Sequence, residues 1–340
     1  MTDTSQSQWL IHPKPYADEL LSCWLVRIAH AHGLKVETFC HLKFGKERPL
    51  WNRDIDRLSP EWLITEICSH IGLSIEAGRA TTLRGYEHVL YPHFHSSGLL
   101  RWILPLKLYH RTRNGFGLQF CPACLAQDTE PYYRRRWRVG FNVFCPKHNC
   151  MHHDRCPRCE APVIFHRLEL GRPDVVDVGP LSTCFKCGFD FRETTPTAPE
   201  PYDRTAYQVL RQAIESLDAP AKYNGTSIDI GFLGVMHQLC KLMTSRYRST
   251  SLRQHVATEL RIKSIPLTNP KIPFILRPIN ERWHLLQLAA WIMTAPELRL
   301  TAAWRAKAIR YNHLEKDFFD PPPWYSAIVN KFSDWRADQR

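Results

Sequence analysis

The N-terminal part of the chain carries apolar residues at helical spacing. One apolar face comprises Leu20, Leu21, Trp24, Leu25, Ile28 and Ala29, and this i, i+3, i+4 recurrence is typical of an amphipathic helix. Asp18 stands before the face as a candidate N-cap, because its side-chain oxygen can accept from a free backbone N–H. Gly33 follows it as a helix stop. The pattern predicts a helix between these two residues and a second short helix over about 35–42.

A further pair of helices is predicted across a glycine-containing turn. Pro60 opens a helix as its first residue, and its apolar face is Trp62, Leu63, Ile67, Cys68 and Ile71. Ser74 caps the next helix, which runs to about Leu83. Helix, tight turn and capped helix is the arrangement of a helix-turn-helix, whose second helix would carry Arg79 and Arg84 toward DNA. An ordinary helical hairpin has the same pattern, so both interpretations stay open.

The pattern becomes helical again beyond residue 203. The three prolines within residues 194–203 predict a linker. After it, apolar periodicity predicts helices over 204–217, 228–247, 280–293, 297–316 and 322–332. Asn280 is the expected cap of one helix, and Pro296 opens another. Residues 299–316 combine apolar and basic positions, which is typical of a basic amphipathic surface helix.

Four short ligand pairs lie between the helical regions. Each pair places two soft ligands three positions apart, and two pairs complete the tetrahedral shell of a structural zinc ion. Taken in order, they predict two structural Zn²⁺ ions, one bound by Cys121, Cys124, Cys145 and His148 and the other by Cys156, Cys159, Cys184 and Cys187. An interleaved pairing stays open, because spacing does not fix connectivity. The loops 125–144 and 160–183 are each long enough for a β-hairpin, and residues 118–120 are expected to lead in as a strand.

An arginine-rich stretch lies inside the first of these loops. Its aromatic residues are interleaved with four candidate nucleic-acid contacts, namely Arg134, Arg135, Arg136 and Arg138. Guanidinium groups suit phosphate contact, and aromatic rings suit base stacking. A solvated charged face is the alternative, and Trp137 is expected in the core in either case.

The composition indicates a class of binding partner and a cellular compartment. The chain has 45 Lys and Arg against 33 Asp and Glu, a net charge of +12, which favours a polyanionic partner such as nucleic acid. The cysteines outside the metal pairs are scattered and are expected to be core residues, as in a reducing cytoplasm: Cys23, Cys40, Cys68, Cys150 and Cys240. No run of about 18 apolar residues occurs, so no membrane span is predicted.

The motifs do not fit a zinc enzyme. A zinc deaminase needs His-x-Glu upstream of Pro-Cys-x-x-Cys, whereas the one His-x-Glu here, at His313, lies downstream of every cysteine. Neither His-Glu-x-x-His nor a Walker A sequence occurs. The remaining enzymatic alternative is a nuclease on a treble-clef zinc scaffold, to which His152, His153 and Asp154 would contribute. We therefore expect no catalytic activity.

Together these patterns predict a mostly α protein with small zinc-ribbon β modules. The expected order is an N-terminal helical domain with the helix-turn-helix, central tandem zinc ribbons, a linker and a C-terminal helical domain. Their predicted bounds are 1–117, 118–193, 194–203 and 204–340.

Several regions of the sequence resemble the TniQ/TnsD family of transposition target-selection proteins. Pro13 to Ala29, with its Pro-x-Pro-x-x-Asp-Glu-Leu-x-Ser-x-Trp-Leu-x-Arg-Ile-Ala pattern, is similar to the opening of that family. The spacing from Phe120 through Trp137 to Gly188 is similar to its zinc region. Residues 282–303 and 320–325 also resemble longer members. The chain departs from the family pattern after the ligand histidine, at Asn149, Cys150 and His152.

The resemblance implies a non-catalytic adaptor in a bacterial cytoplasm. Such a protein links a target-recognition signal, either a DNA site or an RNA-guided CRISPR effector complex, to an AAA+ ATPase and a transposase. The implied partners are that ATPase, a CRISPR effector complex with its guide RNA, target DNA and a second copy in a homodimer, with no membrane. The alternative is a sequence-specific, zinc-containing DNA-binding regulator that uses the helix-turn-helix and the arginine-rich loop.

Overall fold

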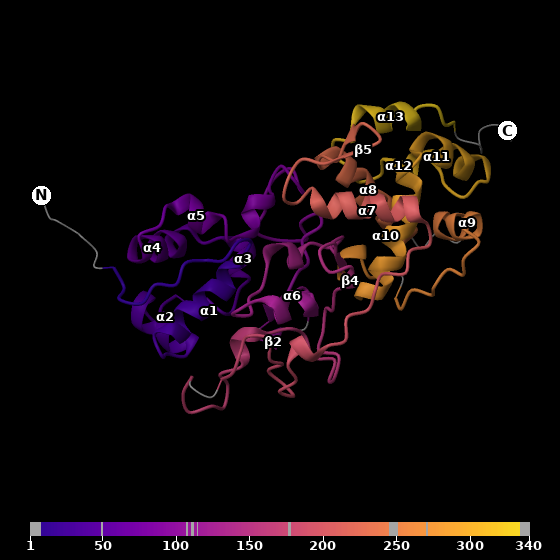
Figure 1. Cartoon of the computed structure of the whole chain (residues 1–340). Helices are drawn as coiled ribbons and strands as arrows, with labels where there is room; N and C mark the ends of the chain where they lie inside the picture. Colours follow the sequence, from indigo (N-terminus) through magenta and orange to yellow (C-terminus); the bar gives the residue numbers. More distant parts are fainter. Residues whose placement is uncertain are drawn as a thin grey trace, which may run out of the picture.

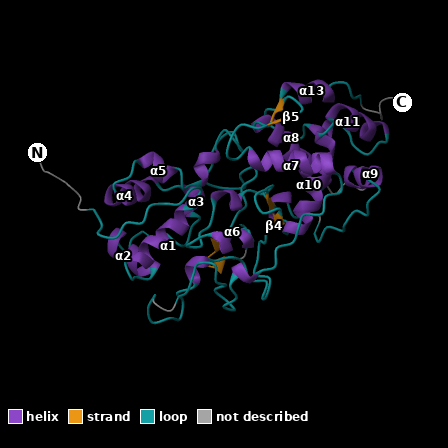
Figure 2. Ribbon diagram, viewed as in Figure 1, coloured by secondary structure: helices purple, strands orange, loops and turns teal. Residues whose placement is uncertain are grey.

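The computed structural model describes residues 8–48, 50–106, 108–109, 112–113, 115–175, 178–244, 251–269 and 271–333. The molecule is elongated, with N-terminal helices at one end, C-terminal helices at the other and a loop-rich middle (Figure 1). Helices and loops dominate, and the few strands are short (Figure 2). The predicted mostly α fold with small β elements is confirmed.

The helices fall into three groups along the chain. The first comprises α1 (Leu21–Ala31), α2 (Val36–Phe44), α3 (Ile55–Leu58), α4 (Glu61–Ile71) and α5 (Ile75–Arg79). The middle holds α6 (Pro122–Gln127). The last comprises α7 (Arg204–Glu215), α8 (Ile230–Met243), α9 (Leu252–Glu259), α10 (Ile279–Met293), α11 (Pro296–Arg305), α12 (Tyr311–Leu314) and α13 (Pro323–Val329).

The described strands form three antiparallel pairs of two residues each. They are β1 (Leu108–Tyr109) with β2 (Thr112–Arg113), β3 (Phe144–Cys145) with β4 (Cys150–Met151), and β5 (Lys222–Tyr223) with β6 (Thr226–Ser227). The last pair was not predicted, although its turn, Asn224-Gly225, carries the dipeptide typical of a tight hairpin. Both turn residues have positive φ, 47° and 80°.

Helix α1 forms the centre of the N-terminal core. All six predicted core residues of this helix are fully buried, and the Trp24 Nε1–H donates to Pro13 O at 2.7 Å. Gly33 ends the helix with φ 67°, as predicted. The predicted Asp18 cap is wrong, because the helix begins at Leu21 without a side-chain cap. The Asp18 carboxylate instead accepts from two arginines of the middle region.

Helices α4 and α5 form the predicted helix, turn and capped helix. The Ser74 Oγ accepts from Ala77 N at 3.2 Å. Gly78 lets the two helices approach closely, since a Cβ there would lie 2.5 Å from Cys68 Sγ. However, α5 ends at Arg79 rather than near Leu83, and the Thr81 hydroxyl bonds back to Gly78 O at 2.7 Å. Pro60 is the N-cap of α4 rather than its first residue.

The middle region differs from the predicted pair of hairpins. Loop 125–144 contains part of α6 and a 3₁₀ turn at Arg135–Arg138, and only Phe120 of the expected lead-in strand pairs, with His153. One side chain replaces strand pairing in this loop. The Gln119 amide nitrogen lies 3.1–3.3 Å from the carbonyl oxygens of Trp137, Val139 and Asn142, so backbone acceptors are satisfied without a regular sheet.

Helix α10 is the centre of the C-terminal region and packs against α7, α8 and α9. The predictions for α7, α8 and α10 hold within a few residues, whereas α9 was missed. The predicted Asn280 cap is wrong, because α10 begins after Pro278 and the Ile279 N–H donates to Asp154 Oδ2 at 3.0 Å. The metal-binding region therefore caps a C-terminal helix.

The predicted long helix over 297–316 is also wrong. Helix α11 ends at Arg305, Lys307 has φ 56°, and α12 starts only at Tyr311. The Ala308 N–H bonds back to Ala303 O at 2.9 Å, which is the closure typical of a helix C-terminus. A continuous basic face is therefore absent from this described segment.

The prolines of residues 194–203 leave this segment in irregular structure. The segment is nevertheless hydrogen-bonded to the metal-binding region and to α10. Met151 N donates to Thr197 O at 2.7 Å, and Tyr202 N donates to Gln287 Oε1 at 2.7 Å. Within the described ranges, we find no helix with the length and apolarity needed to cross a membrane.

Candidate metal centres

The first predicted ligand set converges in space. Cys121 is the N-cap of α6 and Cys124 lies in its first turn, whereas Cys145 ends β3 and His148 lies in the turn after it. The Cys124 and Cys145 sulfurs are 3.8 Å apart, and His148 Nδ1 lies 3.3–3.5 Å from the sulfurs of Cys121, Cys124 and Cys145. Ligands around tetrahedral zinc are separated by about 3.8 Å for sulfur pairs and about 3.5 Å for sulfur and nitrogen. The donor set fits such an ion.

The second ligand set also converges. The sulfurs of Cys156 and Cys187 are 3.6 Å apart, and so are those of Cys159 and Cys184. The ligand atoms within each set lie within 4.8 Å of one another. The structure therefore groups the pairs in sequence order and does not interleave them. Each cluster could hold a metal ion, and a shell of thiolates and imidazole suits zinc.

A neighbouring glutamine orients the ligand histidine. His148 Nε2 lies 2.8 Å from Gln127 Oε1, and because an amide oxygen only accepts, Nε2 carries the proton. The lone pair of Nδ1 is then free to face the three sulfurs. Gln127 is the last residue of α6, so one short helix supplies two ligands and the orientation of another. Sequence reasoning missed this residue, although it follows Cys124 at one helical turn.

We expect Gln127→Leu to weaken metal binding at the first cluster by about 10–100-fold, as loss of such an orienting partner typically does. Competition with a chromophoric chelator measures the affinity, and the second cluster provides an internal reference. Gln208→Leu, an exposed change on α7, is the matched control. Equal affinities for the two variants would show that Gln127 does not orient His148.

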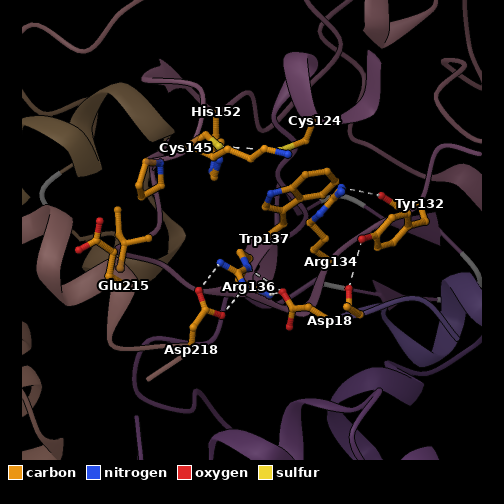
Figure 3. A pocket seen from close by; sticks show the side chains of 14 residues that line it. Asp18, Cys124, Tyr132, Arg134, Arg136, Trp137, Cys145, His152, Glu215 and Asp218 are labelled. Atoms are coloured by element: carbon orange, nitrogen blue, oxygen red, sulfur yellow. Dashed lines mark hydrogen bonds and ion pairs between the residues drawn. The ribbon is translucent and has the colours of Figure 1, made fainter. Parts of the chain in front are cut away.

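Two of the predicted nucleic-acid arginines tie three parts of the chain together. Asp18 accepts from Arg135 Nε at 3.0 Å and from Arg136 Nε at 2.8 Å. Arg136 also donates through Nη1 to Asp218 Oδ2 at 2.8 Å, just beyond α7. Figure 3 shows Arg136 between these two carboxylates. The segment before α1, the first metal loop and the end of α7 therefore meet at one guanidinium.

The other two arginines of the stretch also have partners within the chain. Arg134 forms a bidentate pair with Asp128 at 3.0 and 2.6 Å, and its guanidinium lies over the Tyr132 ring, 4.1 Å from the centroid. Arg138 is fully buried and donates to Asp54 at 2.5 Å and to Leu104 O at 2.8 Å. No surface of Arg138 remains for a nucleic acid, so its role in this structure is internal.

Arg138 also lies in a buried acidic network. Its Nη1 is 3.5 Å from Asp56, which accepts from the Ser22 N–H and hydroxyl at 2.7 Å each. Burial and the neighbouring Asp54 raise the pKa of Asp56 to about 6. This network joins α1, the start of α3 and the first metal loop.

Arg79 and Arg84 are the predicted contacts that stay at the surface, with side chains 53% and 41% exposed. Arg79 pairs with Glu61, and Arg84 pairs with Glu87 at 3.2 Å. Exposed ion pairs of this kind contribute little and can open toward another anion. Nucleic-acid contact by these two residues stays a prediction.

An arginine of helix α10 inserts into the metal-binding region. Arg282 of α10 is fully buried and donates to Gly140 O at 2.7 Å and to Gln119 Oε1 at 3.0 Å. Its Nε also donates to Arg277 O at 3.1 Å, and Asp154 lies 3.8 Å away. Burial lowers the pKa of Arg282 to about 10. These contacts fix α10 against the first metal loop.

The candidate nuclease residues do not converge on a site. His152 Nδ1 lies 2.9 Å from Asn142 O, the His153 ring stacks on Phe120, and Asp154 caps α10. Among the residues that the structure describes, the two Cys/His clusters are the groups found with metal-binding geometry. The structure therefore gives these three residues separate structural contacts.

A cavity of about 370 Å³ lies beside the first cluster (Figure 3). Its wall includes Cys124, Cys145, Trp137 and Lys147 from the metal-binding region, and its rim includes Glu215 of α7. Both signs of charge line it, so it has no evident preference for an anion. His152, which is 3% exposed, also lines it, and its Nε2 has no hydrogen-bond partner.

Comparison with known proteins finds a family model that matches part of the chain. The TniQ family model matches residues 10–151, which span the described helices α1–α6, the first metal cluster and the β3–β4 pair. No curated protein matches the chain. The match coincides with the N-terminal and zinc-region motifs in which the resemblance was noted. Residues 10–151 therefore form a TniQ domain, which supports a transposition-associated target-selection protein in general.

Proposed function

We propose that this chain is a non-catalytic adaptor that carries two structural zinc ions. In this role it links a target-recognition signal to the AAA+ ATPase and transposase of its transposon, in the cytoplasm of a bacterial cell. The signal is either a DNA site or an RNA-guided CRISPR effector complex. The TniQ match over residues 10–151 supports a role in target selection.

One observation favours an adaptor over a direct reader of DNA. The arginine stretch, which offers the densest positive charge in the TniQ region, is bonded to Asp18, Asp54, Asp128 and Asp218 of the same chain. A guanidinium that must contact phosphate would first have to leave these carboxylates. The stretch therefore supports a rigid platform for protein partners rather than an exposed nucleic-acid surface.

The second candidate is a sequence-specific DNA-binding regulator. The α4–α5 pair supports it, because Arg79 and Arg84 lie exposed at and just beyond the end of the second helix. In that case these two residues, and not the arginine stretch, would provide the phosphate or base contacts.

A salt titration of duplex DNA binding tests the choice. We expect weak binding by the free chain at physiological salt, and nearly equal log–log slopes for wild type and Arg79→Ala/Arg84→Ala. Each lost phosphate contact flattens the slope by about 0.9. Tight site-specific binding whose slope falls by about 2 in the double variant would show that Arg79 and Arg84 contact DNA directly, as the regulator requires, and would exclude an adaptor that relies on a CRISPR effector complex. Lys222→Ala/Lys271→Ala, an equal loss of exposed charge elsewhere, is the matched control.

A further inference from the structure

The first metal cluster has a fifth sulfur beside it. Cys150 Sγ lies 3.5 Å from Cys121 Sγ, which is close to the separation of about 3.8 Å expected between two thiolates on one zinc ion. The Cys150 side chain is buried, at 1% exposure. The Ala123 N–H, from the turn that carries Cys121 and Cys124, donates to its sulfur. The sulfur thus receives the kind of backbone hydrogen bond that the ligand Cys121 receives from Cys124 N at 3.3 Å.

Packing alone does not explain a thiol at this position. Three turns of the metal-binding region have the same backbone pairing. In each turn, the cysteine that opens it pairs through its backbone with the residue five positions later. Cys145 pairs with Cys150 across β3 and β4. In the second cluster, Cys156 N donates to Ala161 O and Cys184 N donates to Phe189 O, both at 2.8 Å. The same position therefore accepts a methyl group or an aromatic ring elsewhere in this chain.

A second observation shows that donor atoms exceed ligand positions around this cluster. His152 is 3% exposed, has no partner for Nε2, and lines the cavity beside Cys145 (Figure 3). By contrast, the ligand His148 is only partly buried and lies at the edge of the cluster. Its imidazole is the ligand most open to solvent in the first set.

We propose that Cys150 is a reserve ligand of the first metal centre, which takes the fourth position when the His148 imidazole is absent or displaced. In this exchange the Nδ1–metal bond breaks, the Cys150 sulfur–metal bond forms, and the thiol proton passes to solvent. A shell of three thiolates and one imidazole becomes a shell of four thiolates. Cys150 thereby keeps the metal, and the fold around it, through loss of the exposed ligand.

The test uses Co²⁺ as the probe metal in the full chain. Thiolate-to-cobalt charge-transfer absorbance reports the number of bound thiolates, and metal analysis reports the number of ions. We expect two ions per chain in wild type and in His148→Ala. The charge-transfer absorbance should be higher in the variant, because the number of bound thiolates rises from seven to eight. His148→Ala/Cys150→Ala should hold one ion. The matched control, His148→Ala/Cys240→Ala, removes a distant buried cysteine and should keep two.

Three outcomes would overturn the proposal. His148→Ala could lose one ion, or it could keep two ions without the rise in absorbance, in which case His152 or water fills the position. An insoluble His148→Ala protein would also count against it, because a reserve ligand should keep the region folded. The proposal depends on both clusters binding metal, and wild-type protein that binds fewer than two ions would refute that premise separately.

Discussion

Cys121→Ser/Cys150→Ala is expected to remove one metal ion and to unfold the middle of the chain, because the second change removes the neighbouring sulfur that could replace the lost ligand. Cys121 is fully buried, belongs to the first ligand set and caps α6 through its sulfur at 3.3 Å from Cys124 N. Binding of a structural zinc ion contributes about 10–16 kcal/mol in zinc-finger peptides. A domain is stable by only about 5–15 kcal/mol, so loss of this ion exceeds what the remaining contacts can offset.

Zinc content and thermal unfolding of purified protein measure this effect. Wild type should hold two zinc ions per chain, and Cys121→Ser/Cys150→Ala should hold one and lose its cooperative transition. Cys240→Ala, which removes a buried cysteine outside both clusters, should keep both ions. A Cys121→Ser/Cys150→Ala protein with full zinc and an unchanged melting temperature would mean that the ligand assignment is wrong.

Arg282→Met is expected to destabilise the chain by about 3–5 kcal/mol, as removal of one partner from a buried ionic network does. The methionine fills much of the space but donates no hydrogen bond. Gly140 O and the Gln119 amide oxygen then lose their donor, and Asp154 loses its nearby positive charge. Because these contacts join α10 to the first metal loop, we expect the two to separate at lower denaturant concentration.

Urea unfolding, followed separately by metal release and by helical circular dichroism, measures this change. Arg305→Met is the matched control, since Arg305 is exposed on α11 and surface substitutions usually change stability by less than about 0.5 kcal/mol. If both variants unfold at the wild-type urea concentration, Arg282 does not hold α10 against the metal-binding region.

Local pattern was sufficient for the helices that are built from their own residues. Leu20 to Ala29 repeat at helical spacing and are buried as expected. The metal ligands could be predicted equally well, because the two ligands of each pair are three residues apart and the fold only has to bring the pairs together. In both cases the information lies within one turn of chain.

Contacts between distant residues could not be predicted in this way. Asp18 looked like a helix cap, but its partners are Arg135 and Arg136. Likewise, Val36 at the start of α2 donates to Glu169, at 3.0 and 2.9 Å, from the second metal loop. A sequence window shows that a polar side chain can cap a helix, but not which helix the fold brings to it.

The arginine stretch shows the same limit for function. Arginines interleaved with aromatic residues are compatible with nucleic-acid contact and with internal ion pairing. Which of the two roles applies depends on whether carboxylates from distant parts of the sequence lie beside the arginines. Asp18, which pairs with Arg136, is 118 positions away. Net charge does not resolve it either, because the charge of +12 describes the whole chain and not this segment.

Mapping of insertion sites in cells tests the adaptor function most directly. The chain would be expressed with the ATPase and transposase of its transposon, and compared with its absence and with Cys121→Ser/Cys150→Ala. The account predicts insertions concentrated at one target with wild type, and loss of that concentration in both other cases. An insertion pattern that does not change when the chain is absent would contradict it.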